Sequence, residues 1–492
     1  MTSVQSDVGE AKQFIGGAWA DASGGGTFED RDPFTGDVVA LVPAGGREDA
    51  ARAIEAAAAA FPAWSQSLPA QRQAIFLKAA DVLESRRDEV VGLLARETGA
   101  TFGFAMFQMG FVPGLLRQAA AAAYSPLGQI LPSDHPGTLA MGIRRPVGVV
   151  AAIAPWNAAL ILSARSIAAP LALGNTVVLK PSELSPVAGG LIWGQIFAEA
   201  GLPDGVLNIV THAPGDAAPI GDEFCENPAV RRINFTGSTA TGRRLAEAAG
   251  RNLKRVLLEL GGYNPLLVLA DADLDYAVNA SAFGAFLHQG QICMSARKII
   301  VERPIAEEFT ARLAAKTKTL KAGDPNEPDT IIGPLINEAA LQMVAERVRD
   351  AVAKGATVLA GGEAVGPCFQ ATVITDVPAD SDFAQHETFG PVVAIEVVDS
   401  AEEGVARANA TSYGLSAGIL TSDTDRGFAL AQKLESGIVH VNDQPVGDEP
   451  QMPFGGVKDS GWGRFGGQAV VDEFTELRWI TVQSGTGHPF PF

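Results

Sequence analysis

The sequence predicts an α/β protein with two doubly wound, Rossmann-like domains, and three observations support this fold class. The chain has 492 residues, more than one compact core usually holds, so two or three domains are expected. Hydrophobic residues make up 47% and charged residues 19% of the chain, as in folded globular proteins. Short apolar runs alternate with helical stretches in two series, 147–260 and from about 265 onward, which indicates parallel strands joined by crossover helices.

The charge and the cysteine content argue against several classes of protein. The formal net charge is −19, which is unfavourable for binding nucleic acid or an anionic membrane surface. Cys225, Cys293 and Cys368 are too far apart for a disulfide framework or a zinc site, so we expect a cytoplasmic protein. Residues 1–10 lack the basic and apolar segments of a signal peptide. The uncharged run 101–116 contains glycines and a proline, which favours a buried or pocket-lining segment over a membrane span.

The first part of the chain is expected to be mainly helical. Residues 14–19 predict a short strand. The alanine-rich run 47–64 has apolar residues at helical spacing, and 69–98 predicts a proline-initiated helix that breaks near Ser85. Residues 126–145 combine prolines and glycines with alternating apolar residues, which predicts a hairpin or an extended arm.

The two α/β series indicate where ligands should bind, because open parallel sheets bind ligands at the carboxyl ends of their strands. A terminal strand at 474–483 stands apart from both series and needs a pairing partner, such as another subunit. Strands are expected at 147–154, 176–180, 206–210, 232–235, 255–260, 298–301, 391–398, 416–420 and 437–441. Helices are expected up to about 173 and at 186–200, 215–224, 240–249, 274–289, 305–320 and 339–354.

One cysteine stands in a setting that could make it reactive. Cys293 ends the run FLHQGQIC, after an apolar helical stretch, a glycine and small polar residues. Only a thiolate attacks electrophiles, and backbone dipoles at such a position can favour it. The alternative is an inert buried cysteine. His288 and His386 have no second histidine at metal-ligand spacing, so no metal site is expected.

Two further residues at strand ends could assist a nucleophile. Asn157 follows the strand 147–154 and could donate its amide to a developing oxyanion, or it could cap a helix. Glu259 lies at the end of the apolar strand 255–260, where burial would raise its pKa toward the range of a general base. Its alternative is a glutamate paired for structural reasons.

Other strand ends could bind a nucleotide. Lys180 and Glu183 could contact ribose hydroxyls, and a carboxylate there would repel a 2′-phosphate, favouring NAD over NADP. Gly237 and Ser238 open a helix whose N-terminus suits a pyrophosphate, although the usual GxGxxG fingerprint is missing. Each of these segments, like Glu387 and the glycine-rich loop 453–461, could instead be a simple turn.

Taken together, these motifs carry a family resemblance that covers nearly the whole chain. They occur in one order: APWN, KPSE, FTGS, LELGG, GQIC, ETFGP and PFGG. This set resembles the NAD(P)-dependent aldehyde dehydrogenase superfamily. The resemblance implies an NAD-binding domain over 1–124 and 146–258, a catalytic domain over 259–470, and an oligomerisation domain over 125–145 and 471–492. A homodimer or homotetramer is therefore implied.

The resemblance also assigns roles. Cys293 would attack the aldehyde to give a thiohemiacetal, Asn157 and the Cys293 N–H would hold the oxyanion, and a hydride would pass to NAD, with NADP as a further option. Glu259 would activate the water that hydrolyses the resulting thioester. The cofactor would be bound by Trp156, Lys180, Ser182, Glu183, Gly237, Ser238, Leu260, Gly261, Glu387 and Phe389.

The strings FLHQGQICMS and EPQMPFGGVKDSGWGRFGG look most similar to the branch that acts on vanillin, benzaldehyde and salicylaldehyde. Ala158 stands where phenylalanine is common, which would widen the pocket. Arg165 replaces a common aromatic residue and could donate to a polar ring substituent. The alternatives are an aliphatic or semialdehyde dehydrogenase, such as the succinate-semialdehyde type, and a non-catalytic protein that keeps the fold. Predicted substrate-binding residues are Ala158, Arg165, Phe111, Phe286, Met294 and Phe454.

Overall fold

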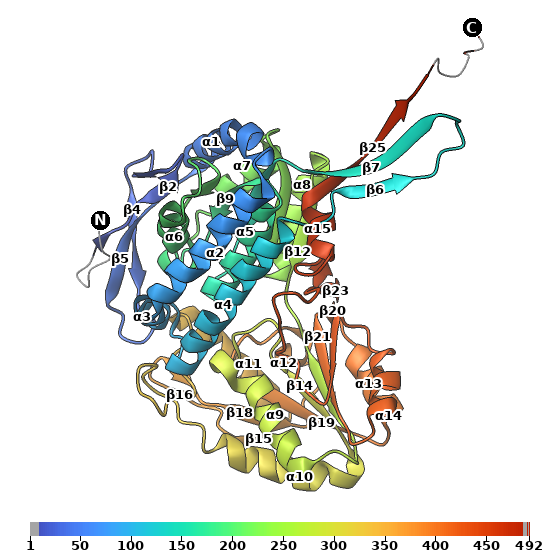
Figure 1. The fold of residues 1–492 in the computed structure, drawn as a ribbon. Coiled ribbons are helices and arrows are strands. Elements are labelled where there is room, and N and C mark those ends of the chain that lie inside the picture. Colours follow the sequence, from blue (N-terminus) through green and yellow to red (C-terminus); the bar gives the residue numbers. More distant parts are fainter. Residues whose placement is uncertain (1–8, 486–489, 491) are drawn as a thin grey trace.

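The computed structural model describes residues 9–485, 490 and 492. The chain forms two α/β bodies and a projecting arm (Figure 1). Residues 1–8, within the segment where we expect no signal peptide, lie outside the described residues. The same holds for 486–489 and 491, within the predicted oligomerisation domain.

The first body is built on an eight-stranded sheet of order β24-β12-β11-β8-β9-β10-β2-β3. Its five central strands pair in parallel, and their residues are almost all buried, which confirms the doubly wound pattern predicted for this part. These strands are β8 (Val149–Ile153), β9 (Thr176–Lys180), β10 (Leu207–Ile209), β11 (Val230–Thr236) and β12 (Arg255–Glu259). The helices of this series are α5 (Ala159–Ala172), η1 (Val187–Leu191), α6 (Ile192–Ala200), α7 (Ala218–Glu226) and α8 (Thr239–Arg251).

The N-terminal part differs from the prediction in two places. The single strand expected at 14–19 is a hairpin of two strands, because Gly16 and Gly17 take positive φ angles and reverse the chain. A small sheet that the sequence did not predict precedes the helices. The elements are β1 (Gly9–Glu10), β2 (Gln13–Ile15), β3 (Ala18–Ala20), β4 (Thr27–Arg31), β5 (Val38–Pro43), α1 (Arg47–Ser65), α2 (Pro69–Ser85) and α3 (Arg87–Thr98).

The uncharged run 101–116 forms most of helix α4 (Phe102–Ala122), which packs against α2 and α5. Its buried face includes Gln108, Met109 and Leu116, while Phe102 and Phe107 remain exposed. In the described part of the chain, no helix combines the length and the apolarity that crossing a membrane requires.

The second body contains a seven-stranded sheet of order β15-β18-β19-β14-β13-β21-β22, parallel except for β15. Its strands are β13 (Pro265–Val268), β14 (Lys298–Glu302), β15 (Thr357–Ala360), β18 (Thr372–Thr375), β19 (Val392–Val398), β21 (Ser416–Leu420) and β22 (Ile438–Val441). Its helices are α9 (Leu274–Phe286), η2 (Leu287–Gly290), α10 (Arg303–Thr317), α11 (Glu338–Ala353), α12 (Asp382–Gln385), α13 (Ala401–Asn409) and α14 (Thr424–Ala431). Short pairs are β16 (Ala364–Val365) with β17 (Cys368–Phe369), and β20 (Tyr413–Gly414) with β23 (Val457–Lys458).

After the second sheet, the chain returns to the first. Strand β24 (Gly461–Trp462) pairs antiparallel with β12, so that Gly461 lies opposite Glu259. The segment between β22 and β24 therefore runs along the junction of the two bodies. It brings the glycine-rich loop predicted at 453–461 to the carboxyl end of β12.

The arm is a three-stranded antiparallel sheet of β6 (Gly128–Leu131), β7 (Thr138–Pro146) and β25 (Thr475–Gln483). Helix α15 (Ala469–Phe474) leads into it, and the arm extends away from both bodies (Figure 1). The terminal strand thus pairs along its length with β7 of the same chain. Ile130, Leu477 and Trp479 on this sheet are 77%, 65% and 77% exposed.

Candidate active site

The segment that carries Cys293 is an irregular turn rather than the end of a helix. Helix α9 ends at Phe286, earlier than predicted, and His288 and Gln289 take φ angles of 49° and 53°. Gln289 donates hydrogen bonds of 3.0 Å to the carbonyls of Gly99 and Pro334, and the His288 ring stacks on Phe104 at 4.2 Å. These contacts hold a backbone conformation that is otherwise unfavourable.

Cys293 is the one partly exposed cysteine of three, since Cys225 and Cys368 are buried. The Asn264 amide donates to the Cys293 carbonyl at 2.7 Å, and a Cβ on Gly262 would lie 2.6 Å from the same oxygen. The glycines of LELGG therefore allow close approach of the two segments. Sequence reasoning missed Asn264, whose φ of 48° shows that it turns the chain into β13.

The surroundings of Cys293 keep its thiol protonated. Burial raises its pKa to about 12, and the charges of Glu387 and Glu259 act in the same direction, whereas Arg165 opposes them. A thiol with so high a pKa needs a base to become a nucleophile. His288 cannot serve, because burial lowers its pKa to about 3 and leaves no basicity near neutrality.

Asn157 follows β8 and lies against the cysteine segment. Its side chain is nearly fully buried, and its Nδ2 donates to the Gln291 carbonyl at 2.9 Å. An asparagine amide has two N–H groups, so this bond leaves one for an oxyanion near Cys293. The geometry therefore joins Asn157 to the nucleophile segment rather than to a helix cap, since the α5 N-cap residue is Ala158.

Glu259 is the last residue of β12 and is 3% exposed. Neither carboxyl oxygen has a hydrogen-bond partner among the described residues. Burial raises its pKa well above the usual glutamate value, against the opposing charges of Arg165 and Arg464. A Cβ on Gly455 would lie 2.6 Å from its Oε1, so the PFGG glycine leaves room for this carboxyl. A buried, unpartnered carboxyl group is suited to exchange protons.

Glu387 also lies within electrostatic reach of Cys293, and its carboxylate is held by a hydrogen bond. The Gly262 N–H donates to its Oε1 at 3.2 Å. Burial raises its pKa, while Arg297, that N–H and Arg347 oppose the rise. A side chain at Gly261 would clash with the Glu387 carboxylate. The structure thus brings together the predicted cofactor residues Gly261 and Glu387.

Two predicted aromatic residues meet beside this carboxylate. Trp156 and Phe389 pack edge to face, with ring centroids 5.7 Å apart. The Arg297 guanidinium lies 5.9 Å from the Phe389 ring and donates to the Gly390 carbonyl at 2.8 Å. Arg297 is almost completely buried, and sequence reasoning did not identify it.

The carboxyl ends of β9 and β10 carry a second polar cluster. Lys180 Nζ lies 2.7 Å from His212 Nε2, and a Glu183 carboxylate oxygen lies 3.6 Å from the same nitrogen. Burial lowers the pKa of Lys180 to about 8 and that of His212 to about 4. The Ser182 hydroxyl donates to Glu183 at 3.2 Å. His212 is a further residue that the sequence did not single out.

The N-terminus of α8 faces the same edge of the sheet. Ser238 is its N-cap residue and accepts a hydrogen bond from the Thr241 N–H at 3.3 Å. Gly242 packs against Leu260, where a Cβ would come within 2.5 Å of that side chain. Helix N-termini favour phosphate groups, and carboxylates such as Glu183 and Glu387 can accept from ribose hydroxyls. The two clusters and this terminus fit a dinucleotide.

The predicted substrate residues do not all come together. Ala158, Met294 and Phe454 belong to one buried apolar cluster with Phe111 packed against it. Phe286 is 1% exposed and lies in the core of the second body, so its prediction as a substrate contact does not match its position. Phe286 packs instead with core residues such as Leu266 and Ile299.

Arg165, predicted to donate to a polar ring substituent, has one of its nitrogens engaged by a carboxylate. It forms an ion pair with Asp448, and both side chains are almost buried, at 7% and 11% exposure. Its guanidinium lies 4.2 Å from the Phe454 ring centroid and 5.9 Å from that of Phe111. The partner Asp448 could not be anticipated from the local sequence.

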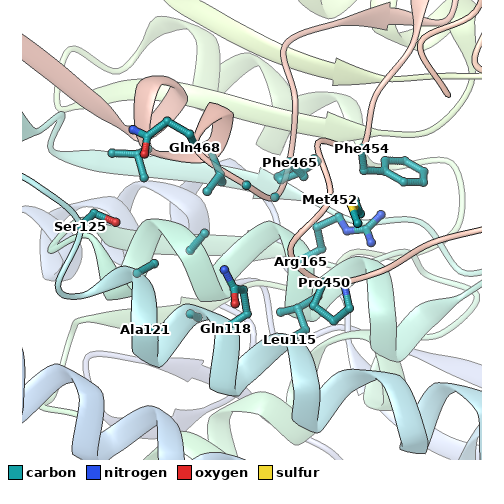
Figure 2. A pocket seen from close by; sticks show the side chains of 17 residues that line it. Leu115, Gln118, Ala121, Ser125, Arg165, Pro450, Met452, Phe454, Phe465 and Gln468 are labelled. Carbon is teal, nitrogen blue, oxygen red and sulfur yellow. The ribbon is translucent and has the colours of Figure 1, made fainter.

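A cavity of about 320 Å³ is lined in part by Arg165 (Figure 2). Arg165 stands at the end near Phe454, and Gln118 and Ser125 lie farther along it (Figure 2). Across the described residues, no group of three His, Cys, Asp or Glu side chains is arranged to hold a metal ion. The cavity is lined by Leu115, Gln118, Ala119, Ala121, Ala122, Ser125, Arg165, Ala169, Pro450, Met452, Phe454, Phe465, Gly466, Gly467, Gln468, Val470 and Val471.

Comparison with known proteins gives consistent relatives. The profile of the aldehyde dehydrogenase family matches residues 19–480. A vanillin dehydrogenase of Pseudomonas fluorescens is 49% identical, over 96% of this chain and 98% of that protein. A benzaldehyde dehydrogenase [NAD(+)] of Pseudomonas putida is 43% identical, over 96% of each chain. The crystal structure of a salicylaldehyde dehydrogenase from Pseudomonas putida G7 complexed with salicylaldehyde superposes with a TM-score of 0.96 at 42% identity, covering 99% of this chain and 100% of that one.

Proposed function

This chain belongs to the aldehyde dehydrogenase family, and on that premise we propose that it oxidises aromatic aldehydes of the vanillin, benzaldehyde or hydroxybenzaldehyde type to carboxylic acids, with NAD as cofactor. The chain is an aldehyde-oxidising oxidoreductase by family. One observation carries the reaction: partly exposed Cys293 lies within the electrostatic reach of the buried, unpartnered Glu259. The relatives named for aromatic aldehydes support the substrate class.

The first step of the proposed reaction is attack by Cys293. Because burial holds the thiol pKa near 12, a base must remove its proton, and Glu259 has two free carboxyl oxygens for that purpose. The sulfur then adds to the aldehyde carbon. The oxyanion of this thiohemiacetal would accept hydrogen bonds from the free Asn157 N–H and the Cys293 backbone N–H.

The second half of the reaction is oxidation and hydrolysis. When bound, NAD supplies the acceptor for the hydride that the adduct loses. The resulting thioester stays on Cys293, and Glu259 releases the thiol proton to solvent. Glu259 then removes a proton from the water that attacks the thioester. Cleavage of the C–S bond releases the carboxylic acid, and Glu259 returns its proton to the cysteine thiolate. Splitting the reaction at the thioester separates oxidation from hydrolysis.

The preference for NAD is proposed from the cluster at the end of β9. His212 is neutral near pH 7 because burial lowers its pKa to about 4, so it does not offset the charge of Glu183. A 2′-phosphate placed beside that carboxylate would be repelled. Lys180, Ser182 and Ser238 would contribute donors to the ribose and pyrophosphate.

We further propose that the arm joins subunits into a homodimer or a homotetramer. Its three strands expose large apolar side chains, among them Ile130 and Trp479 at 77% each. Exposed apolar patches of this kind on a soluble chain usually mark an interface.

The test of the proposed function is a panel of aldehydes assayed with both cofactors. We expect the highest kcat/KM for benzaldehyde-type substrates with NAD. A preference for succinate semialdehyde or for short aliphatic aldehydes would contradict the proposed substrate class. Absence of NADH formation with every aldehyde, although NAD binds, would contradict the catalytic role.

A further inference from the structure

The ion pair between Arg165 and Asp448 is unusual for an aromatic pocket. Arg165 comes from α5, and Asp448 comes from the segment between the two sheets. Both side chains are almost completely removed from solvent, at 7% and 11% exposure. Desolvating two charges opposes folding unless their hydrogen bonds are complete.

The hydrogen bonds of this pair are not complete. Asp448 Oδ2 accepts from Arg165 Nη2, but Asp448 Oδ1 has no hydrogen-bond partner among the described residues. Burial raises the pKa of Asp448, while the charge and hydrogen bond of Arg165 and the backbone N–H of Glu449 oppose the rise. The Arg165 guanidinium binds Oδ2, so Oδ1 of this carboxylate is the acceptor that lacks a donor.

Contacts and charges connect this pair to the residues assigned to the reaction. Gly455 lies against Glu259, the preceding Phe454 stacks on Arg165, and Arg165 holds Asp448. Figure 2 shows Arg165 and Phe454 at the same end of the cavity. The charges of Arg165 and Asp448 reach both Cys293 and Glu259, while the side-chain hydrogen bond of Asp448 is with Arg165.

We propose that Asp448 Oδ1 accepts a hydrogen bond from a ring hydroxyl of the aldehyde substrate, and that Arg165 is the residue that positions this carboxylate. Asp448 lies within electrostatic reach of both Cys293 and Glu259, and Arg165 pairs with its other oxygen. The inference rests on the proposed aromatic aldehyde oxidation and narrows it to phenolic aldehydes.

The chemistry of the pair predicts which substituents are accepted. A carboxylate only accepts hydrogen bonds, so it selects a hydroxyl over its methyl ether, which has a similar electronic effect on the ring but no donor. A ring carboxylate would be repelled by Asp448. Arg165 is consequently a brace for Asp448, instead of the direct substrate donor that the sequence suggested.

The experiment compares kcat/KM for 3- and 4-hydroxybenzaldehyde with the values for their methyl ethers, at saturating NAD and a pH at which the hydroxyl stays protonated. The wild-type protein should prefer the hydroxyl by about tenfold or more, because an unmet buried acceptor rejects the ether. In Asp448→Asn, the amide oxygen should face the donors of Arg165 and the NH₂ group should replace Oδ1. The ratio should then fall to about one or lower.

A matched control is Glu473→Gln, which disrupts the buried pair between Glu473 and Arg232, at 16% and 1% exposure. Its hydroxyl-to-ether ratio should equal that of the wild type. Each ratio comes from one preparation, so loss of folded protein cancels; if Asp448→Asn does not fold, Asp448→Ser gives the same comparison. A wild-type ratio near one, or an unchanged ratio in the Asp448 variant, would overturn the inference. If benzaldehyde is oxidised without any hydroxyl preference, this inference alone fails; if no aromatic aldehyde is oxidised, the proposed function fails.

Discussion

Glu259 and Glu387 both act electrostatically on Cys293, and they differ in how they are held. Glu259 is 3% exposed and Glu387 is half-buried, and both raise the pKa of the Cys293 thiol. Glu387 accepts the Gly262 N–H and faces the charges of Arg297 and Arg347. Glu259 has no hydrogen-bond partner among the described residues, and a Cβ on Gly455 would lie 2.6 Å from its Oε1.

This difference separates two uses of the same side chain. A carboxylate fixed by hydrogen bonds presents its remaining lone pairs in one direction, as binding a cofactor requires. A carboxyl group without hydrogen-bond partners can gain or release a proton without breaking a hydrogen bond, as general base catalysis requires. Asp448 resembles Glu259 in this respect, since its Oδ1 has no hydrogen-bond partner among the described residues. Mutations of Glu259 and of Glu387 should therefore affect different steps of the reaction.

Replacing the nucleophile Cys293 should have the largest effect on activity. Cys293→Ala should lower NADH formation from benzaldehyde by about 10⁴-fold or more, because no covalent intermediate can form. The assay is NADH absorbance with enzyme in excess, together with calorimetric NAD binding. Cys225→Ala, which changes a buried thiol elsewhere, should keep its activity. Substantial turnover by Cys293→Ala would contradict the assignment of the nucleophile.

Removing the free carboxyl should have the next largest effect. Glu259→Gln should lower kcat by about 10²- to 10⁴-fold, the usual range for losing a general base. Thioester hydrolysis should become the slowest step, so a slower first turnover should still release about one NADH per active site. Rapid-quench and stopped-flow assays separate these phases. An unchanged kcat would exclude Glu259 as the base.

The pH profile checks the same assignment. Burial raises the pKa of Glu259, so the ionised base is lost as the pH falls through that raised value, at a higher pH than for an ordinary glutamate. As the pH is lowered, the wild-type kcat should therefore begin to fall at a pH above about 4.3, the ordinary pKa of a glutamate. In Glu259→Gln this acid limb should flatten.

Changing the fixed carboxylate should affect the cofactor instead. Glu387→Gln should lower kcat/KM for NAD by about 10- to 100-fold, because a charged acceptor for a hydroxyl is lost. The first turnover should slow while the thioester hydrolysis rate stays unchanged, opposite to Glu259→Gln. Glu396→Gln, which disrupts a partly exposed pair with Lys298 at 2.8 Å, is the control in the same body. If Glu387→Gln and Glu259→Gln slow thioester hydrolysis equally, the two carboxylates do not have different roles.

The sequence predicted the parts of this site that local patterns encode. Asn157 and Glu259 follow apolar strands, and Cys293 follows an apolar helical stretch, so their meeting at one sheet edge follows from the α/β alternation. Asp448 escaped prediction because its partner Arg165 is 283 residues away in the sequence. His212 and Arg297 were missed because their roles depend on burial beside residues from other elements, which no local pattern shows. Phe286 was misassigned for the same reason.

The smallest expected effect is that of Glu183 on the choice between NAD and NADP. Glu183 is 28% exposed in its side chain and lies 3.6 Å from a His212 that is neutral near pH 7. Lys180, whose pKa burial lowers to about 8, is the nearest counter-charge. Glu183→Gln keeps the shape and removes the charge that would repel a 2′-phosphate. The ratio of kcat/KM for NADP to that for NAD should rise about tenfold, measured with benzaldehyde.

Glu199→Gln is the matched control for that variant, since Glu199 is an exposed glutamate on α6 of the same body. Its cofactor ratio should not change. Because Glu183 keeps partial contact with solvent, screening weakens its repulsion, which is why this effect should be smaller than that of Glu387. Raising the salt concentration should therefore reduce the difference between wild type and Glu183→Gln. If the wild-type protein uses both cofactors equally well, Glu183 does not act on the 2′-phosphate. That outcome would leave the predicted difference between Glu259 and Glu387 unchanged.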